Sequence, residues 1–318
     1  MSDIDLSIIV VAWNVKELLD ECFTALRNSK DTLKKQIILV DNGSVDGSAD
    51  FVSENYPEVE LIKSQTNLGF IRANNLAYKQ AVGKYILMLN SDAFVFPDTL
   101  QKTFDFMEKT PEAGVVGARL IGRDGVLQPS ARFFPTPFKL FLRSIGLDGK
   151  LPFVGPLDDI EREHDTVREC DWVVGCYLLT RKEIVDKMGF FLREDYFMYN
   201  DDNDICKRIN KLGYKTFFYP VDVIHLGGAT AKKMEGVNKE SALINKFLIE
   251  SQFIYFRKNY GLFSVINNYT LTSLYYHLKI IKQVFSLKKW ENLKHYTEQL
   301  NLMSKILFST GFGSRSIH

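Results

Sequence analysis

Short apolar runs alternate with helical patterns through the first third of this chain. The runs cover residues 6–11, 36–40, 59–62 and 85–89 and are rich in Val, Ile and Leu. Apolar residues between the first two recur at helical spacing over residues 18–26, which is typical of a helix with one buried face. Strands that alternate with helices of this length predict right-handed crossovers and a mostly parallel sheet covered by helices on both faces.

The pattern predicts further elements along the chain. We expect Asn14 to cap the first helix, and we expect residues beyond Gly228 to be helical. Residues 119–170 lack a clear period and are rich in Gly, Pro and Phe, which is more typical of a functional excursion than of a plain connector. The remaining predictions are helices at 48–55, 70–82, 181–188 and 201–212, and strands at 172–179 and 214–219.

Composition excludes several classes of protein. The formal net charge of the 318 residues is +1, so the overall charge does not predict nucleic acid as a partner. The four cysteines form no CxxC pair, and we expect buried free thiols in a reducing compartment. Because the first strand begins within a few residues of Met1 and no apolar run reaches about 18 residues, we expect a cytoplasmic protein without a signal peptide or a membrane span.

Polar residues follow two of the apolar strands directly. Asn90, Ser91 and Asp92 come after the run at 85–89, and Asp41 comes after the run at 36–40. Open α/β sheets bind ligands at the carboxyl ends of their strands, so Asp92 is a candidate metal ligand and Asp41 a candidate partner of a ribose or a base. The alternative for the second segment is an ordinary turn with a helix cap from a nearby Asp or Ser.

The turn after the first strand reads Ala12-Trp13-Asn14 and contains no GxGxxG. This absence argues against a dinucleotide-dependent dehydrogenase. Asn67 and Asn74 flank the start of the helix predicted at 70–82, where amide groups are suited to phosphate or base contacts.

An acidic cluster opens the helix predicted at 201–212. At about 100° per residue, Asp202 lies at the centre of the apolar stripe, whereas Asp204 lies on the opposite side, beside Arg208. A buried carboxylate without a partner is costly unless a site requires it, so we expect Asp202 to be functional and Asp204 to pair with Arg208. The alternative is that all of the acids, with Asp201, merely complement the helix dipole.

His225 follows another predicted strand and precedes two glycines. Its imidazole could complete a metal site with Asp92, and a hard or borderline ion such as Mn²⁺ fits carboxylate, imidazole and phosphate together. A structural histidine is the alternative.

In this order, the segments resemble the inverting family 2 glycosyltransferases of GT-A fold, and most closely the bacterial rhamnosyltransferase-like enzymes that build surface polysaccharides. The likeness covers about residues 5–260 and lies in an ordered set of segments: 6–14, 40–48, 67–75, 89–92, 172–175, 197–208 and 225–228.

The resemblance implies a role for each matched residue. Asn90 and Asp92 stand where the family has its DxD motif, with Asp92 and His225 as ligands of Mn²⁺ or Mg²⁺, although Asn90 replaces the usual first Asp. Asp201 and Asp202 match an acidic pair whose second member is the general base. The nucleotide-sugar-binding positions are Ala12, Trp13, Asn14, Asp41, Asn67, Asn74, Asn90 and Asp92, and the acceptor-binding positions are Arg132 and Trp172.

The implied reaction is transfer of a sugar, with dTDP-rhamnose as the donor, to a lipid-linked or glycan acceptor at the cytoplasmic face of the membrane. A nucleotidyltransferase that makes activated sugars is one rival, but the turn at Ala12-Trp13-Asn14 lacks the Gly-rich, basic phosphate loop expected of it. A non-catalytic sensor of sugar nucleotides is a second rival, against which an intact Asp202 argues.

By this interpretation, residues 1–260 form the GT-A domain, with 1–118 binding the nucleotide sugar and 119–260 carrying the acceptor site and the catalytic residues. Residues 261–318 form a helical extension. In that extension Leu271, Leu274, Leu278, Ile281 and Phe285 form one stripe with Lys279, Lys282, Lys288 and Lys289 nearby. A helix lying on an anionic membrane would have this pattern, and core packing or the seam of a homodimer are the alternatives.

Overall fold

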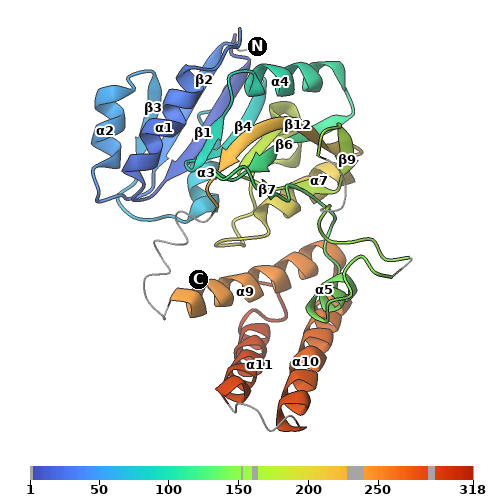
Figure 1. Cartoon of the computed structure of the whole chain (residues 1–318). Coiled ribbons are helices and arrows are strands. Elements are labelled where there is room, and N and C mark those ends of the chain that lie inside the picture. Colours follow the sequence, from blue (N-terminus) through green and yellow to red (C-terminus); the bar gives the residue numbers. More distant parts are fainter. Residues whose placement is uncertain (1–2, 152, 160–163, 228–239, 286–290, 318) are drawn as a thin grey trace. The chain divides into compact units, whose positions relative to one another are not determined.

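The computed structural model describes residues 3–151, 153–159, 164–227, 240–285 and 291–317. The chain divides into two compact units. The first comprises 1–132, 158–194 and 201–237, and the second comprises 133–157, 195–200 and 238–318. Figure 1 shows the chain with its helices and strands labelled.

The first unit is built on a mixed sheet with the strand order β3-β2-β1-β4-β11-β6-β12-β5. Strands β1 to β4 are mutually parallel, β6 and β12 are parallel, and β11 runs antiparallel between β4 and β6. The bounds are β1 Leu6–Ala12, β2 Lys35–Asp41, β3 Val59–Lys63, β4 Tyr85–Asn90, β5 Ala93–Val95, β6 Ala113–Ile121, β7 Leu127–Gln128, β8 Ala131–Arg132, β9 Arg168–Cys170, β10 Trp172–Val173, β11 Tyr177–Arg181 and β12 Lys215–His225. The predicted sheet is confirmed.

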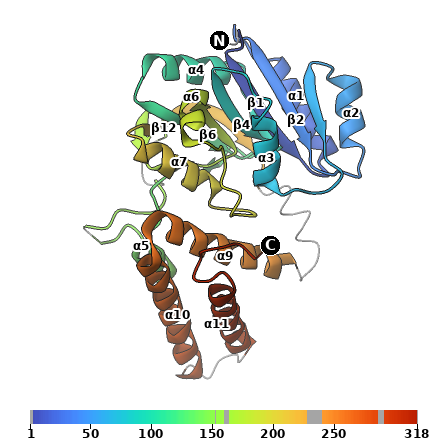
Figure 2. The same ribbon diagram turned by 180° about the vertical axis from the view of Figure 1, so that it is seen from behind.

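Helices cover both faces of this sheet, because alternate residues of its strands are buried on opposite sides. Ile8 and Val10 of β1 belong to a core with α1 (Lys16–Arg27), α2 (Ser48–Asn55) and α4 (Thr99–Lys109). The other face carries α3, α6 and α7, as Figure 2 shows. Their bounds are α3 Phe70–Tyr78, α6 Lys182–Met188 and α7 Asp201–Lys211.

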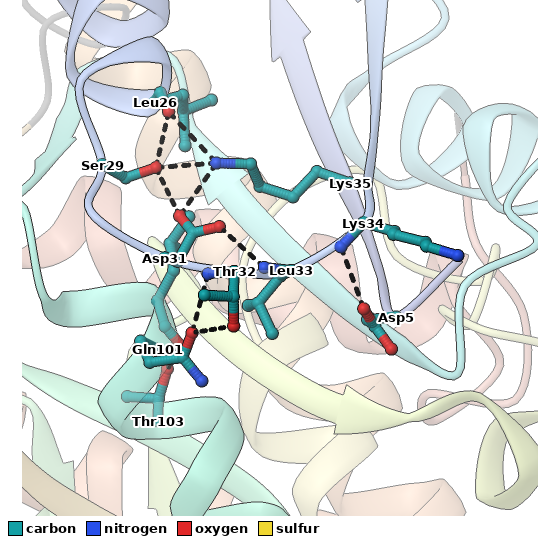
Figure 3. Close-up of polar contacts among 11 residues, drawn as sticks. Asp5, Leu26, Ser29, Asp31, Thr32, Leu33, Lys34, Lys35, Gln101 and Thr103 are labelled. Atoms are coloured by element: carbon teal, nitrogen blue, oxygen red, sulfur yellow. Dashed lines mark hydrogen bonds and ion pairs between the residues drawn. The ribbon is translucent and has the colours of Figure 1, made fainter. Parts of the chain in front are cut away.

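A buried carboxylate anchors the connection from α1 to β2 (Figure 3). The side chain of Asp31 is 1% exposed, accepts a hydrogen bond from Lys35 Nζ at 2.8 Å and accepts another from the Leu33 N–H at 3.2 Å. Lys35 also donates to Ser29 Oγ at 2.7 Å, so the pair is satisfied from several sides. These bonds hold the segment that leads into β2.

The second unit is built mainly of helices in its described residues. Thr136 caps α5 (Pro137–Ser144) by accepting from the Lys139 N–H, and Pro137 occupies the first helical position, where its missing N–H costs nothing. The longer helices are α9 Glu240–Tyr260, α10 Leu262–Phe285 and α11 Glu291–Ser309, which confirms the helical C-terminal extension. Among the described helices, none is long and apolar enough to cross a bilayer.

The prediction that Asn14 caps α1 is wrong. The residue before the helix is Val15, and it makes no side-chain cap. Asn14 instead has φ +54°, donates its N–H to Ser44 Oγ at 2.9 Å, and accepts from the Val45 N–H at 2.8 Å. The side-chain oxygen of Asn14, which was expected to cap the helix, is instead bonded to the Val45 N–H in the loop after β2.

Three element boundaries also differ from prediction. The strand predicted at 172–179 is broken into β10 and β11, because residues 174–176 leave the ladder to meet α7. Residues 119–170 contain short strands and α5 rather than a continuous excursion, since two-residue strands have no visible period. The last predicted strand runs on to His225, so His225 ends β12 rather than following it.

Candidate functional site

The parallel register brings three strand ends to one edge of the sheet. Val11 pairs with Asn90 and Ala12 pairs with Asp41, so β4 and β2 end on either side of β1. Asp41 is 4% exposed. Its Oδ1 and the Oδ1 of Asn90 are both buried without a hydrogen-bond partner in the described structure.

Asn74 adds a third buried oxygen without a partner. Its Nδ2 donates to the Phe70 carbonyl within α3, which leaves its Oδ1 without a donor although the residue is only 1% exposed. Helix α3 lies against β1 and β2, the strands that end at Ala12 and Asp41. Buried polar atoms are nearly always paired, so unpaired acceptors at a sheet edge indicate a place for a ligand with N–H or O–H groups.

Asn42 holds the loop before α3 against the end of β2. Its side chain accepts from the Leu68 N–H at 2.8 Å and donates to Asn67 Oδ1 at 3.0 Å. Gly43 is required beside it, because φ is +82° and a Cβ would stand 2.8 Å from the backbone of Thr66. The side-chain oxygen Oδ1 of Asn67 thus accepts hydrogen bonds within this loop.

The strand ends continue into a carboxylate and an imidazole. Asp92 directly precedes β5, and the antiparallel pairing of β5 with β12 sets Ala93 opposite His225. The Leu226 N–H donates to the Asp92 carbonyl at 3.1 Å, which ties the two segments together. Asp92 is 7% exposed, and its Oδ1 lies 3.7 Å from His225 Nε2.

Gln128 orients the imidazole of His225. Its Nε2 donates to the His225 carbonyl at 2.8 Å, and its Oε1 lies 2.8 Å from His225 Nδ1. A backbone carbonyl only accepts, so the amide has one possible orientation and Nδ1 must carry the proton. Burial lowers the pKa of His225, against the opposing effect of the Asp92 carboxylate. The neutral ring therefore directs the lone pair of Nε2 at Asp92.

Two acceptors that face each other across 3.7 Å are suited to a cation. One ion with bonds of about 2.0–2.2 Å reaches both atoms, and the Gln128 contact is the kind of outer support that metal-binding histidines have. The described residues contain no cluster of three or more His, Cys, Asp or Glu side chains that could hold a metal. The residues present thus fit an ion that takes its other ligands from substrate or water.

The first turn of α7 carries the acidic cluster. Tyr199 and Asn200 precede it with φ values of +69° and +60°, an uncommon conformation for two consecutive residues other than glycine. Asp201 is 8% exposed, and its carboxyl pKa is raised to about 8 by burial and by Asp202.

Asp204 is more buried than predicted. It is fully buried rather than on an outer side of α7, and its Oδ2 lies 2.8 Å from Arg208 Nε and 3.5 Å from Arg193 Nε. The predicted pair with Arg208 is confirmed, whereas the solvent-facing position is wrong because Arg193 and the carbonyls of residues 190–191 enclose the pair.

Asp202 is only half-buried and is held by backbone groups. It accepts from the Asn203 N–H at 2.8 Å and from the Gly175 N–H at 3.3 Å. A Cβ at Gly175 would stand 3.3 Å from Asp202 Cβ and 2.9 Å from Met88 Cε, so glycine permits the approach. Burial raises the pKa of Asp202, while these N–H groups and Arg132 oppose the rise.

Cys176 links the two acidic centres. Its carbonyl accepts from the Asn90 N–H at 3.0 Å, and it follows Gly175 in the chain. Burial raises the pKa of its thiol well above the usual value, and Asp92 and Asp202 both add to that rise. The carboxylates at the end of β4 and at the start of α7 therefore lie near the same thiol.

Arg132 and Trp172 meet across the two-stranded sheet of β8 and β10. They are paired in register, and the guanidinium lies 5.1 Å from the centre of the indole ring. Arg132 also lies 3.5 Å from Asp158 Oδ1. Its effect on the pKa of Asp202 puts the cation within electrostatic reach of that carboxylate.

The predicted site residues thus gather at one edge of the sheet, around the ends of β1, β2 and β4 and the start of α7. Sequence reasoning missed Asn42, Gln128 and Gly175. Asn42 and Gly175 lie within segments that carried the resemblance, but Gln128 occupies a two-residue strand and acts only through a contact 97 positions away. No local signal identifies it.

Comparison with known proteins agrees with this arrangement. The family model described as glycosyl transferase family 2 matches residues 7–156. An N-acetylglucosaminyl-diphospho-decaprenol L-rhamnosyltransferase of Mycobacterium tuberculosis is 28% identical over 203 residues, which are 59% of this chain and 66% of that protein. The amylovoran biosynthesis glycosyltransferase AmsB of Erwinia amylovora is 25% identical over 68% of this chain and 67% of its own length.

Solved structures support the fold. A mannosyltransferase from Pyrobaculum calidifontis, in complex with GDP-Man and Mn²⁺, superposes with a TM-score of 0.52 at 15% identity, covering 99% of this chain and 88% of that one. Residues 1–349 of S. aureus TarS with UDP-GlcNAc give 0.51 at 15% identity, covering 97% and 92%. The predicted GT-A fold is confirmed. Residues 7–156 of this chain match glycosyltransferase family 2, and the chain resembles the rhamnosyltransferases of that family.

Proposed function

We propose that this chain moves a sugar from a nucleoside diphosphate to a hydroxyl of a lipid-linked or glycan acceptor, with inversion at the anomeric carbon. The relatives named for rhamnosyl transfer and for amylovoran synthesis support a role in building a surface or cell-wall polysaccharide. We propose dTDP-rhamnose as the donor because the mycobacterial relative is named a rhamnosyltransferase.

The observation that carries this proposal is the set of unpaired acceptors at the sheet edge. The buried Oδ1 atoms of Asp41, Asn74 and Asn90 lack donors within the described structure. A pyrimidine base supplies an imide N–H, and a ribose or deoxyribose supplies hydroxyls, so a nucleotide would satisfy them. Ala12 ends β1, and Trp13, Asn14 and Asn67 belong to the two loops that border the same strand ends.

Asp92 and His225 would hold a divalent ion, Mn²⁺ or Mg²⁺, with Gln128 presenting His225 Nε2. Such an ion, when bound, neutralises charge on the departing diphosphate. Asn90 contributes no charge at the position of the family's usual first Asp, so Asp92 is the carboxylate on which binding depends.

Asp202 would act as the general base. Its carboxylate takes the proton of the acceptor hydroxyl while the bond from that oxygen to the anomeric carbon forms. The bond from the anomeric carbon to the diphosphate breaks, and its electrons leave with the nucleoside diphosphate. Burial and the neighbouring Asp202 raise the pKa of Asp201 to about 8, whereas two backbone N–H groups favour the ionised form of Asp202, so the negative charge of the pair is favoured on Asp202.

Arg132 and Trp172 would receive the acceptor. The guanidinium of Arg132 stacks on the indole of Trp172, and such a stacked guanidinium can still donate N–H groups to the oxygens of a diphosphate. Lipid-linked acceptors carry a diphosphate. The mycobacterial relative is named for an acceptor of that class. An acceptor with a lipid tail stays at the membrane, so we propose that this chain works at the membrane surface.

A binding assay tests the proposal without requiring the acceptor. Thermal unfolding should be measured with dTDP-rhamnose, UDP-GlcNAc and GDP-mannose, each with and without Mn²⁺. A ligand at about 100 times its dissociation constant stabilises the native state by about 2.7 kcal/mol. We expect stabilisation by dTDP-rhamnose that increases with Mn²⁺ and is lost in Asp41→Ala.

The matched control for Asp41→Ala is Asp50→Ala, at an exposed carboxylate on α2. It should leave the ligand response unchanged. If no nucleoside diphosphate stabilises the wild-type protein, the proposed function is wrong. If UDP-GlcNAc or GDP-mannose alone stabilises it, only the donor is wrong.

A further inference from the structure

One side of α10 exposes large apolar side chains along the whole helix. Phe263 is 89% exposed, Leu274 45%, Leu278 47%, Ile281 52% and Phe285 83%. At about 100° per residue, the last four fall within about 60° of one another, and Phe263 falls in the same sector. We call these residues, with Ile266, the outer face of α10. The alternative was that this stripe packs in a core. In the structure, Leu274, Leu278, Ile281 and Phe285 are exposed instead.

The opposite side of α10 is already occupied. Val265 and Asn268 are buried, Tyr269 Oη lies 2.8 Å from Ser304 Oγ of α11, and the helix also lies against α5 and α9. Leu271, which the sequence grouped with the stripe, is only half-exposed. The helix therefore has a packed side and an apolar side that the described residues of its unit leave uncovered.

A surface groove lies at the N-terminal end of this face. It encloses about 530 Å³ and is lined by Tyr260, Phe263, Ser264, Ile266, Asn267 and Thr270. Two of these residues belong to the outer face, so the face is hollowed at one end. An exposed apolar surface of this extent indicates an interaction site.

The charge of α10 favours an anionic partner. Its 24 residues contain no Asp or Glu, whereas Lys282 is exposed about 40° from Leu278 and Lys279 lies further around the same edge. Lysines beside an apolar stripe reach lipid phosphates while the stripe enters the acyl boundary.

We infer that the outer face of α10 lies on an anionic lipid surface, parallel to the membrane plane. A helix of 24 residues is about 36 Å long, but α10 does not meet the requirements for crossing a bilayer. A second copy of the chain fits this face less well, because two α10 helices would bring lysines together with no acidic residue from either helix to neutralise them.

This inference deepens the proposed function, because it assigns the contact that keeps the chain near a lipid-linked acceptor. It can be tested independently of the reaction, since lipid binding requires neither donor nor turnover. Contacts of this kind combine apolar burial with attraction to anionic headgroups, so both components should be measurable separately.

The experiment is flotation of the full chain with vesicles of phosphatidylcholine alone or with 30% phosphatidylglycerol, at low and high salt. We expect binding to the anionic vesicles that weakens with salt, and a loss of about tenfold or more in the double variant Leu278→Glu/Ile281→Glu. Lys282→Glu should weaken binding to anionic vesicles only. Leu212→Glu is the matched control, because Leu212 is 48% exposed and directly follows α7, away from α10 in the chain; it should float like the wild type.

Three results would overturn the inference: no flotation of the wild type at low salt, equal flotation of the double variant, or a wild-type dimer that the double variant converts to a monomer without any lipid binding. Nucleotide-induced stabilisation, measured in the same preparations, keeps the two proposals apart. If it persists while flotation fails, the lipid contact is wrong and the proposed sugar transfer from a nucleoside diphosphate stands.

Discussion

Two acidic regions of this protein contrast sharply: the end of β4 and the first turn of α7. At the end of β4, Asp92 lies 3.7 Å from an imidazole whose Nε2 lone pair Gln128 directs toward it. At the start of α7, Asp204 is enclosed by Arg208 and Arg193, while Asp202 two residues earlier accepts hydrogen bonds from backbone N–H groups.

The difference shows that burial alone does not identify a functional carboxylate. Asp204 is the most buried of these acids, and its charge is neutralised within the chain. Asp92 faces the imidazole of His225, whereas Asp202 accepts from backbone N–H groups, and each lies at the ligand edge of the sheet. We therefore expect substitutions at Asp202, at Asp204 and beside Asp92 to change three different properties: transfer, stability and metal affinity.

Asp202→Asn should have the largest effect. The amide keeps the shape but cannot take a proton, so transfer should fall by about 10³-fold or more, measured as product formed from dTDP-rhamnose. Donor-induced thermal stabilisation should persist. In the wild type, the rate should fall as pH drops through the raised pKa of Asp202, because only the carboxylate acts as a base. Loss of donor binding together with transfer would instead indicate a binding or folding role.

Asp204→Asn should act on stability. The amide removes a buried charged partner of both Arg208 and Arg193, which costs about 3 kcal/mol of unfolding free energy, measured by urea denaturation. Asp98→Asn is the control, because its pair with Lys102 is exposed and should contribute less than about 1 kcal/mol. At a temperature where Asp204→Asn is folded, its turnover should be near normal. A turnover defect as large as that of Asp202→Asn would mean that Asp204 also has a functional role.

Gln128→Leu should have the smallest effect. Leucine fills similar space but neither accepts from His225 Nδ1 nor donates to the His225 carbonyl, so Mn²⁺ affinity should fall by about ten- to a hundredfold. Titration of free Mn²⁺ by electron paramagnetic resonance measures this without any turnover. Gln101→Leu, on α4, is the matched control. Unchanged affinity in Gln128→Leu would mean that Gln128 serves only to join β7 to β12.

Much of the first unit could be predicted because its signals are local. The apolar runs that became β1, β2 and β4 are continuous, and parallel pairing places their ends at one edge whatever the loops do. Asp41, Asn90 and Asp92 follow from that rule alone. The short strands β7, β8 and β10 could not be predicted, since two residues have no period and their pairing depends on partners far along the chain.

The sequence by itself determined the α/β class, the strand ends that carry polar residues and the stripe on α10, because each depends on residue type and spacing within a short segment. Only the tertiary structure decided that Asn14 closes a turn instead of capping a helix, that Asp204 is buried between arginines, and that Gln128 orients His225. Those contacts join residues from separate segments, and their energies depend on distances that exist only once the chain has folded.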